Sequence, residues 1–500
     1  MLFNSYIFIF IFLPVALLGY FGLNKLGVEK LSKAFLCGMS LWFYAYFNVS
    51  YLWIIVGSVL ANFVISYLLN YARTPLQHKF GKWCGVLVNL GIFFYFKYYD
   101  FFFDNVNTLF KTSFALKHIA LPLGISFFTF QQLSYIIDRA NGKTKHYDLI
   151  DYLTFVTFFP QLIAGPIVLY SEMLPQFSDE SKKRFQMENF SAGFCLFTIG
   201  LAKKVLLADV LARVANFGYA QTIYMDSLST FLTVLFYTFQ IYFDFSGYSD
   251  MAIGIGRMFN IDLPANFNSP YKACTVKEFW QRWHMTLSRF FVTYVYIPLG
   301  GSRKGRARTM LNTLIIFSLS GLWHGANWTY IAWGTLQGIL VVWDNMGIVG
   351  VKGVKEKIPA KLHIPRWLGW ILTMLFFMLS LVFFRSESMT MAFEMLKNLF
   401  AFRYTGFLPK LFAQLDLPEF YIVKQALSMF APEKEALLYA VIFIILLIIS
   451  VVVLAQKNAL EIMKKQQSKY TTGFALWISV LFVWSVISFS QVSTFIYFTF

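Results

Sequence analysis

Apolar residues recur along this chain in blocks about as long as one helical crossing of a lipid bilayer. The blocks from Leu437 to Leu454 and from Phe474 to Ile487 carry no charged residue. Apolar stretches lie at 2–23, 34–48, 50–71, 84–103, 119–137, 151–169, 189–216, 227–248, 310–325, 327–347, 366–385, 436–456 and 473–490. The pattern predicts an all-α polytopic membrane protein with about 11–13 membrane helices plus re-entrant or amphipathic helices.

Composition favours lipid over water as the solvent of this surface. Hydrophobic residues make up 58% of the 500 positions and charged residues only 13%, against roughly 25% charged residues in a soluble domain. A very large soluble core does not explain uncharged runs of membrane-spanning length. The first run, Leu2 to Leu23, has no charge ahead of it and no small-residue cleavage pattern, so we expect a retained span rather than a signal peptide.

The net charge of +17 fits basic loops between spans better than a nucleic-acid surface, because Lys and Arg cluster between apolar runs. The main clusters are Lys25, Lys30 and Lys33; Arg73, Lys79 and Lys82; Arg139, Lys143 and Lys145; Arg303, Lys304, Arg306 and Arg308; Lys352, Lys355, Lys357 and Lys361; and Lys457, Lys464 and Lys465. They predict a cytoplasmic face and a multi-pass protein that contacts membrane lipids. The four cysteines lack CxxC spacing, and neither a disulfide nor a metal site is expected.

We expect one membrane domain over residues 1–500, without repeats or a separate soluble domain. Its approximate parts are N-terminal helices at 1–170, a core at 171–347, and C-terminal helices at 348–500 with a surface segment at 386–435. Between about residues 170 and 310, Pro, Gly and charged residues interrupt membrane-like sequence. Irregular backbone at membrane depth lines a cavity or packs inside protein, so a site is expected there.

His324 is the histidine in the most apolar surroundings, within LSGLWHGANW. An imidazole that has lost its hydration favours the neutral form, which can accept a proton as a general base. A structural histidine that donates to a backbone carbonyl is the equally weighted alternative. Gly321 and Gly325 on either side allow close backbone or ligand approach, which favours a functional role.

The segment 276–291, VKEFWQRWHMTLSRFF, is predicted to form an amphipathic or re-entrant helix. Helical spacing would place Gln281, His284 and Ser288 on one face, and Arg282 and Arg289 on another. The cations suit either an anionic nucleotide-containing donor or lipid phosphates, and lipid is the simpler interpretation.

Residues 240–271 place Asp244 and Asp250 in or beside an apolar span. An intramembrane carboxylate is a functional hypothesis by default. A pair with Arg257 or a capping role is weighed equally. A relay of Ser246, His324 and Asp244 has no support in linear order, and the GIGRMF glycines lack the strand and Lys of a phosphate loop.

Six segments together resemble a known family. They are PLGISFFTFQQLSYIID (122–138), FFPQLIAGPI (158–167), YFDFSGYSDMAIGIGRMFNIDLPANFNSPY (242–271), EFWQRWHMTLSRF (278–290), YIPLGGSRKG (296–305) and LSGLWHGANWTYIAWG (319–334). In this order they resemble the membrane-bound O-acyltransferase superfamily, in particular the bacterial branch that acetylates alginate, peptidoglycan and other polysaccharides.

The resemblance implies a ring- or cup-shaped bundle around a tunnel in a bacterial inner membrane, with no permanently bound cofactor. Acetyl-CoA would be the cytoplasmic donor, and His324 would match the family's active-site histidine, with His284 matching its upstream histidine. Supporting candidates are Asp244, Trp323, Asn327, Ser288 and Gln281. Donor binding is expected of Arg282, Arg289, Arg303 and Lys304. In one departure from the family pattern, this chain has Gln337 at a position in WGTLQGILVVWDN where the branch usually has a histidine.

The resemblance also implies a partner, an extracytoplasmic acetyltransferase of the SGNH-hydrolase type, that completes the ester on a polymer. Abundant Phe, Lys, Tyr and Ile indicate an AT-rich genome, which favours peptidoglycan over alginate as the final acceptor. The rival classes are a membrane transporter or lipid-linked glycan flippase, in which interrupted helices and buried polar residues are also expected, and a non-catalytic scaffold of a secretion complex.

Overall fold

The computed structural model describes residues 1–354, 360–466, 471–491 and 495, and this part of the chain is mostly helical. The N-terminal part contains α1 (Leu13–Lys25), α2 (Glu29–Ala45), α3 (Tyr51–Leu68), α4 (Pro75–Lys97), α5 (Tyr99–Phe110), α6 (Ile125–Ala140), α7 (Leu149–Thr157), α8 (Phe159–Leu162) and α9 (Tyr170–Ser178). The middle contains α10 (Met187–Ala202), α11 (Asp209–Ala220), α12 (Ser227–Met258), α13 (Val276–Trp280), α14 (Met285–Phe291), α15 (Arg306–His324) and α16 (Trp328–Asn345).

The C-terminal part contains β1 (Val349–Val351), β2 (Leu362–Ile364), α17 (Arg366–Arg385), α18 (Met389–Leu399), α19 (Leu408–Phe412), α20 (Tyr421–Phe430), α21 (Glu435–Ala455), α22 (Ala459–Gln466) and α23 (Thr472–Ile487). Wider π-helical turns occur at η1 (Phe8–Phe12), η3 (Lys203–Ala208) and η6 (Val292–Tyr296), and tighter 3₁₀ turns at η2 (Glu180–Lys182), η4 (Thr222–Tyr224), η5 (Pro270–Lys272), η7 (Ala413–Leu415), η8 (Pro418–Phe420), η9 (Pro432–Lys434) and η10 (Ser488–Gln491).

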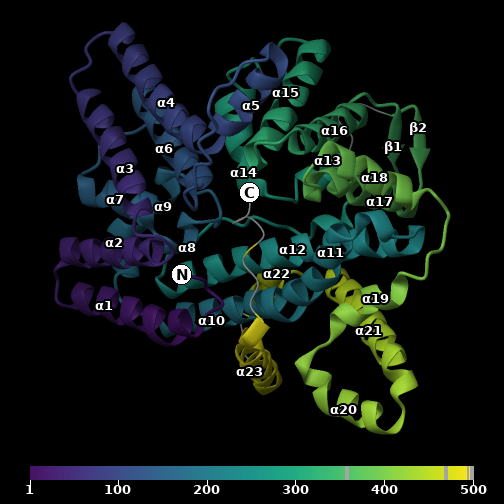
Figure 1. Cartoon of the computed structure of the whole chain (residues 1–500). Coiled ribbons are helices and arrows are strands. Elements are labelled where there is room, and N and C mark those ends of the chain that lie inside the picture. The colour runs from purple at the N-terminus through teal and green to yellow at the C-terminus, as the bar shows by residue number, and fades with distance from the viewer. Residues whose placement is uncertain (355–359, 467–470, 492–494, 496–500) are drawn as a thin grey trace.

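Helix α12 is the central element of the fold (Figure 1). It has 32 residues, nearly all of them buried, and at 1.5 Å per residue it extends roughly 48 Å, longer than the bilayer core. Helix α10 crosses it closely, because a Cβ at Gly193 or Gly200 would lie within 2.6 Å of the backbone oxygen of Gly254 or Gly247. These glycines let the two backbones touch, as in other membrane helix pairs.

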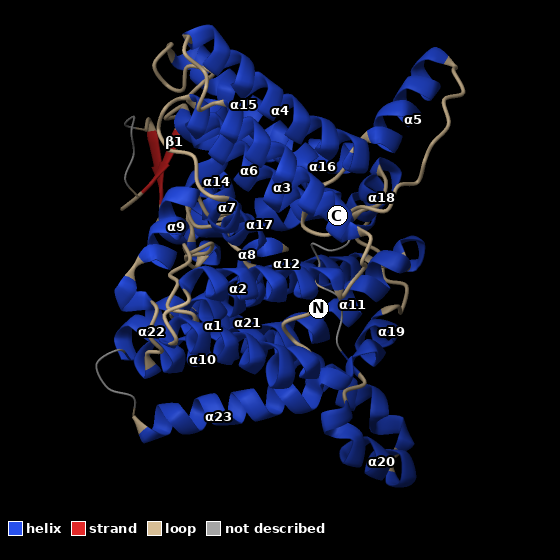
Figure 2. Cartoon of the chain, turned by 90° about the vertical axis from the view of Figure 1, so that its left-hand side faces the viewer, coloured by secondary structure: helices blue, strands red, loops and turns tan. Residues whose placement is uncertain are grey.

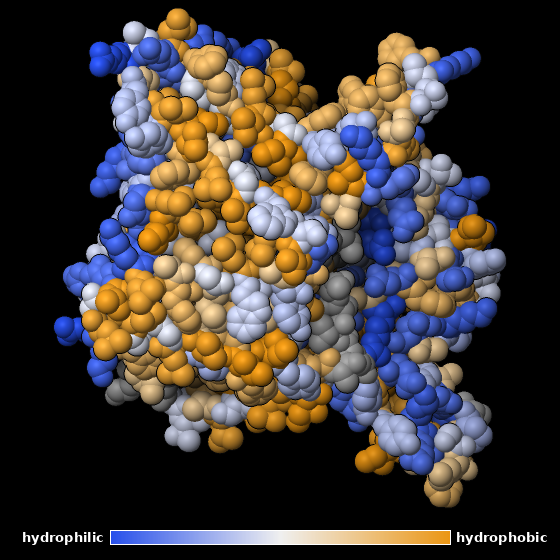
Figure 3. All heavy atoms as spheres, turned by 60° about the vertical axis from the view of Figure 1, so that its left-hand side comes forward, coloured by the Kyte–Doolittle hydropathy of each residue, from blue (hydrophilic) through white to orange (hydrophobic). Residues whose placement is uncertain are grey.

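Five helical spans are long and apolar enough to cross a membrane: η1 with α1, then α3, α12, α17 and α21. The pair α4–α5, bent by 70°, would add a sixth. Exposed apolar side chains cover much of the face shown in Figure 3. Leu60 of α3 and Leu87 of α4 are among the exposed apolar residues of the chain. The protein is therefore a multi-pass membrane protein, although by length and composition alone the described part of the chain gives fewer spans than the 11–13 expected from the sequence.

The apolar stretch 151–169 does not form the continuous helix that its hydropathy predicted. Helix α7 ends at Thr157, Pro160 lies in the first turn of α8, and the chain from residue 163 to 169 is irregular. Proline lacks the backbone N–H that would continue the hydrogen bonding of a helix. A hydropathy scale does not detect this missing donor, so the break could not be seen from apolar content alone. The irregular segment is buried inside the protein. Non-helical backbone at membrane depth must be shielded from lipid in this way, because lipid cannot satisfy its polar groups.

The all-α prediction was also wrong in one detail. Strands β1 and β2 pair in parallel, with Val349 opposite Leu362 and Val351 opposite Ile364. Each strand has three residues, too few for a period-two pattern to stand out from the sequence. Figure 2 shows the pair at one edge of the molecule, away from α23.

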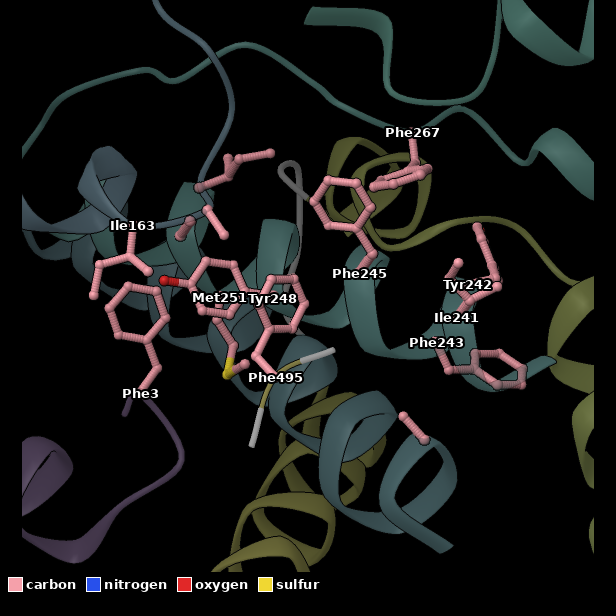
Figure 4. Close-up of a cluster of buried hydrophobic side chains, with 14 of the residues drawn as sticks. Phe3, Ile163, Ile241, Tyr242, Phe243, Phe245, Tyr248, Met251, Phe267 and Phe495 are labelled. Carbon is pink, nitrogen blue, oxygen red and sulfur yellow. The ribbon is translucent and has the colours of Figure 1, made fainter. Parts of the chain in front are cut away.

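Aromatic side chains near both ends of the chain pack on the middle of α12. The rings of Phe3 and Phe495 stack on Tyr248, with centroids 4.8 and 4.5 Å away. Figure 4 shows these side chains together with Phe245 and Phe267. Residues 386–435, the predicted surface segment, contain α18, α19 and α20. Helix α18 buries Ala392 and Met395, whereas α20 buries none of its residues and projects from the body (Figures 1 and 2).

Candidate active site

His324 is the last residue of α15 and lies in an aromatic cage. Its side chain is 3% exposed, and the ring centroids of Trp323, Trp333 and Phe384 lie 4.9, 5.2 and 5.3 Å from its own. These rings come from α15, α16 and α17. The cage excludes water from the imidazole, which raises the effective strength of any polar contact it makes.

A close crossing of α15 and α16 sets the position of His324. A Cβ at Gly321 would lie 2.2 Å from the backbone oxygen of Tyr330 and 3.1 Å from the Cα of Gly334. One turn later, a Cβ at Gly325 would lie 2.1 Å from the ring of Tyr330. The glycines that flank His324 therefore allow close backbone approach, as the sequence suggested, and the approaching group is α16.

His284 lies beside His324, although 40 positions separate them along the chain. The two ring centroids are 6.5 Å apart, and His284 is fully buried, with Phe245 of α12 edge-on at 4.8 Å and Trp323 at 6.1 Å. The sequence singled out both histidines, and the fold brings them together. Two imidazoles at this separation can both reach one reacting group.

The continuous helix predicted for 276–291 is wrong, because the chain breaks between Trp280 and Met285. His284 occupies the left-handed region at φ 43° and precedes α14, and a non-glycine residue in that region is uncommon. Gln281 is consequently exposed while His284 is buried, so they do not share a face. The break turns His284 inward, and helical spacing could not anticipate it.

Hydrogen bonds orient His284 through Asn266, in the segment that follows α12. The N–H of Ile167 donates to Thr286 Oγ1 at 3.0 Å, and Thr286 Oγ1 donates to Asn266 Oδ1 at 3.0 Å. His284 Nδ1 lies 2.9 Å from the same oxygen. Because an amide oxygen only accepts, this network assigns the proton to Nδ1 and leaves Nε2 with the lone pair of the neutral ring.

Asp244 and Asp250 are held by lysines rather than by the histidines. Lys204 Nζ lies 2.7 Å from Asp244 and 2.8 Å from Asp209, and Lys203 pairs with Asp250 and donates to Ser246 Oγ at 3.1 Å. Both lysines lie in the π-helical turn η3. The suggestion of an Arg257 pair named the wrong partner, since cations 40 residues upstream cannot be recognised from local spacing.

The four predicted donor-binding cations differ in their surroundings. Arg282 pairs with Glu278 at 2.8 Å, and Arg289 pairs with Glu172 and donates to the carbonyl of Ile167 at 3.0 Å. Both therefore have structural partners that would compete with a ligand. Arg303 and Lys304 lie exposed in the turn before α15, where they are available to an anion.

The remaining supporting candidates are dispersed. Trp323 stacks on Phe130 of α6 at 5.3 Å and contacts both histidine rings. Asn327 caps α16 by accepting from the N–H of Thr329 at 3.1 Å, and Ser288 lies partly buried on α14. Gln337, which stands where the resemblance implies a histidine, accepts from Trp280 Nε1 at 3.2 Å and donates to Ser380 at 2.7 Å. The amide of Gln337 therefore hydrogen-bonds two buried groups, the indole of Trp280 and the hydroxyl of Ser380.

Sequence reasoning missed several residues that touch the histidine pair. Asn266 and Thr286 lie in the quoted family segments but were not singled out, and Trp333 was treated as span sequence. Lys97 was also missed, although an isolated cation inside the apolar stretch 84–103 is unusual enough to mark a functional position.

Comparison with known proteins identifies the class to which this site belongs. The model of MBOAT, the membrane-bound O-acyltransferase family, matches residues 110–384, and the chain belongs to that family. It is a membrane-bound O-acyltransferase, which confirms the family predicted from the six segments.

Named relatives cover most of the chain. It is 42% identical over 427 residues to the peptidoglycan O-acetyltransferase of Helicobacter pylori, covering 80% of each protein. It is 38% identical over 413 residues to the probable alginate O-acetylase AlgI of Pseudomonas aeruginosa, covering 80% of this chain and 75% of the relative. The corresponding protein of Pseudomonas syringae is 39% identical over 415 residues, covering 80% and 76%.

Proposed function

We propose that this enzyme moves acetyl groups from cytoplasmic acetyl-CoA across a bacterial inner membrane for the O-acetylation of peptidoglycan. The observation that carries the proposal is the pair of buried imidazoles, His284 and His324, 6.5 Å apart at the end of α15. A pair of proton-accepting groups walled from water suits acyl transfer to a hydroxyl, in which a proton must leave as the new ester bond forms.

In the proposed reaction, the imidazole of His324 takes the proton of an acceptor hydroxyl. The hydroxyl oxygen attacks the carbonyl carbon of the acetyl thioester, and the carbon–sulfur bond breaks. The sulfur leaves with the electron pair of that bond and receives the proton from His324, giving free CoA thiol and an acetyl ester. His284, with its proton on Nδ1, presents Nε2 as a second acceptor that orients a protonated group.

The donor would approach from the basic face of the protein. Arg303 and Lys304 lie exposed in the turn that leads into α15, the helix that ends at His324. Exposed cations attract the phosphates of CoA over several ångströms, whereas Arg282 and Arg289 are engaged by carboxylates. We therefore assign donor steering to Arg303 and Lys304, and structural roles to the other two.

Peptidoglycan is the acceptor that we favour. A 42% identical relative is named for it, and alginate is named for relatives at 38% and 39% identity. The final ester would be made by a separate SGNH-type acetyltransferase outside the membrane. The bundle would then form a tunnel. Helices that are shorter or less apolar than the identified spans, such as α10, α15 and α16, would add crossings toward the 11–13 expected.

The test is release of CoA thiol and transfer of radiolabelled acetyl by detergent-purified protein, with the host's extracytoplasmic fraction as acceptor. His324→Ala should lower turnover by about a thousandfold while its melting temperature stays near that of the wild type. The matched control is His363→Ala, which changes an exposed histidine of β2. Full turnover by a well-folded His324→Ala protein would remove His324 from the chemistry.

The acceptor is tested separately in cells. Deleting the gene should abolish O-acetyl groups on muropeptides measured by mass spectrometry, and wild-type protein should restore them. Unchanged muropeptides with loss of acetate from a secreted polysaccharide would contradict peptidoglycan as acceptor without contradicting acyl transfer.

A further inference from the structure

The end of α15 lacks the usual means of terminating a helix. Gly325, the residue after His324, has extended backbone angles, φ −162° and ψ 149°, so no left-handed residue folds the chain back onto the last turn. The last four carbonyl groups of any helix have no partner within it, and burying them unpaired is costly. For α15 these carbonyls belong to residues 321–324, and the fourth is that of His324 itself.

All four of these carbonyl groups accept a hydrogen bond, and three of them accept it from a side chain outside α15. The N–H of Gly325 donates to the carbonyl of Gly321 at 3.4 Å. Tyr98 Oη donates to the carbonyl of Leu322 at 2.9 Å. Lys97 Nζ donates to the carbonyls of Trp323 and His324 at 2.6 and 3.2 Å.

Lys97 and Tyr98 lie where α4 ends and the chain bends by 70° into α5. The third hydrogen bond of Lys97 goes to Ser126 Oγ at 3.3 Å, and its ammonium lies 5.8 Å from the ring centroid of Trp323. A cation at the carboxyl end of a helix also faces the negative end of the helix dipole. Bonds from a charged donor are stronger than neutral ones, which suits a site that must not move.

We infer that Lys97 and Tyr98 are positioning residues that fix the last turn of α15, and with it the imidazole of His324, by capping the carbonyls of residues 322–324. The pair acts through the backbone of α15. The inference rests on the proposed role of His324. Displacement of the imidazole by about an ångström is enough to slow catalysis severely.

The experiment uses full-length purified protein and four variants. Lys97→Met keeps the length of the side chain and removes its donors, Lys97→Arg restores a cationic donor, and Tyr98→Phe removes one hydroxyl. Lys117→Met is the matched control, because the ammonium of Lys117 lies over the rings of Tyr95 and Tyr99, 4.9 and 4.6 Å from their centroids. The backbone N–H of Lys117, which the substitution keeps, donates to Asp100 Oδ1 at 2.7 Å. Two readouts are measured: steady-state release of CoA thiol, and hydrogen exchange of peptides covering residues 318–327.

Lys97→Met should lower kcat about tenfold or more while KM for acetyl-CoA stays within about twofold, and exchange at residues 318–327 should accelerate about tenfold. Lys97→Arg should recover most of both losses, Tyr98→Phe should show a smaller loss of each, and Lys117→Met should show none. If Lys97→Met fails to fold, Tyr98→Phe combined with Ser126→Ala carries the same test.

Wild-type kcat and exchange in Lys97→Met would overturn the inference, and so would a loss expressed in KM alone, which would indicate donor binding. Equal loss in Lys97→Met and Lys97→Arg without faster exchange at residues 318–327 would also overturn it. If the proposed function is wrong, the wild type itself will release no thiol, which distinguishes that failure from the results above. Hydrogen exchange at residues 318–327 would still show whether Lys97 and Tyr98 hold the end of α15.

Discussion

Two buried polar regions of this membrane protein differ in how their polar groups are compensated. Around η3, each carboxylate of α12 faces a lysine, so Asp244 and Asp250 are ion-paired. At the end of α15, aromatic rings surround His284 and His324. His284 Nδ1 donates to Asn266 Oδ1, and Lys97 donates to the backbone carbonyl of His324. A neutralised ion pair holds helices together, whereas a caged imidazole can still exchange a proton, so burial alone does not separate structural from functional polar residues.

Removing the cation shared by two carboxylates should have the largest effect on folding. Lys204→Met removes the cation that Asp209 and Asp244 share. Breaking a buried ion pair in this way lowers the free energy of unfolding by about 3–5 kcal/mol. We expect little folded protein after detergent extraction, measured by size-exclusion chromatography and thermal melting. Lys457→Met, at an exposed lysine, is the control, and a Lys204→Met protein that melts like the wild type would contradict the structural role of the network.

Gly321→Ala should be less damaging to folding, but it acts directly on the histidine region. The new methyl group would lie 2.2 Å from the backbone oxygen of Tyr330, and overpacking of this kind costs about 1–3 kcal/mol. Melting temperature and thiol release should both fall. Gly22→Ala meets no atom within 4 Å and should change neither, so equal behaviour of the two variants would show that the α15–α16 crossing does not position His324.

Asn266→Ala should have the smallest effect on stability and a selective effect on turnover. It removes the oxygen that accepts from His284 Nδ1 and from Thr286 Oγ1. Loss of the hydrogen bond that orients the imidazole corresponds to about a tenfold change in rate. Thiol release should fall about tenfold with little change in KM for acetyl-CoA. Asn260→Ala, at another buried asparagine after α12, is the comparison, and an equal loss there would mean that the effect comes from general loosening of the loop.

The family and the main chemical candidates were predictable from sequence, because they depend on local motifs. The six segments led to the confirmed membrane-bound O-acyltransferase family, and hydropathy indicated a multi-pass helical protein. His324 stood out because its neighbours are apolar and small. The resemblance also singled out His284, whereas its position 6.5 Å from His324 is a property of the fold.

The rest depended on contacts between distant segments, which periodicity does not encode. The left-handed conformation of His284 follows from packing of the turn before α14 rather than from residue type. The partners of Asp244 come from η3 and those of the α15 carbonyls from the α4–α5 bend. Hydropathy also did not register that Pro160 and the irregular segment after α8 interrupt the apolar stretch 151–169.

The most direct test of the account compares the two polar regions in one assay. Thiol release per folded molecule is measured for His324→Gln and for the double variant Lys203→Met with Asp250→Asn, which removes both charges of one buried pair together. The account predicts that His324→Gln melts like the wild type and releases no thiol above background, while the double variant keeps most of its turnover. Retained turnover in His324→Gln, with loss of turnover in a well-folded double variant, would contradict it and place the chemistry at the carboxylates of α12.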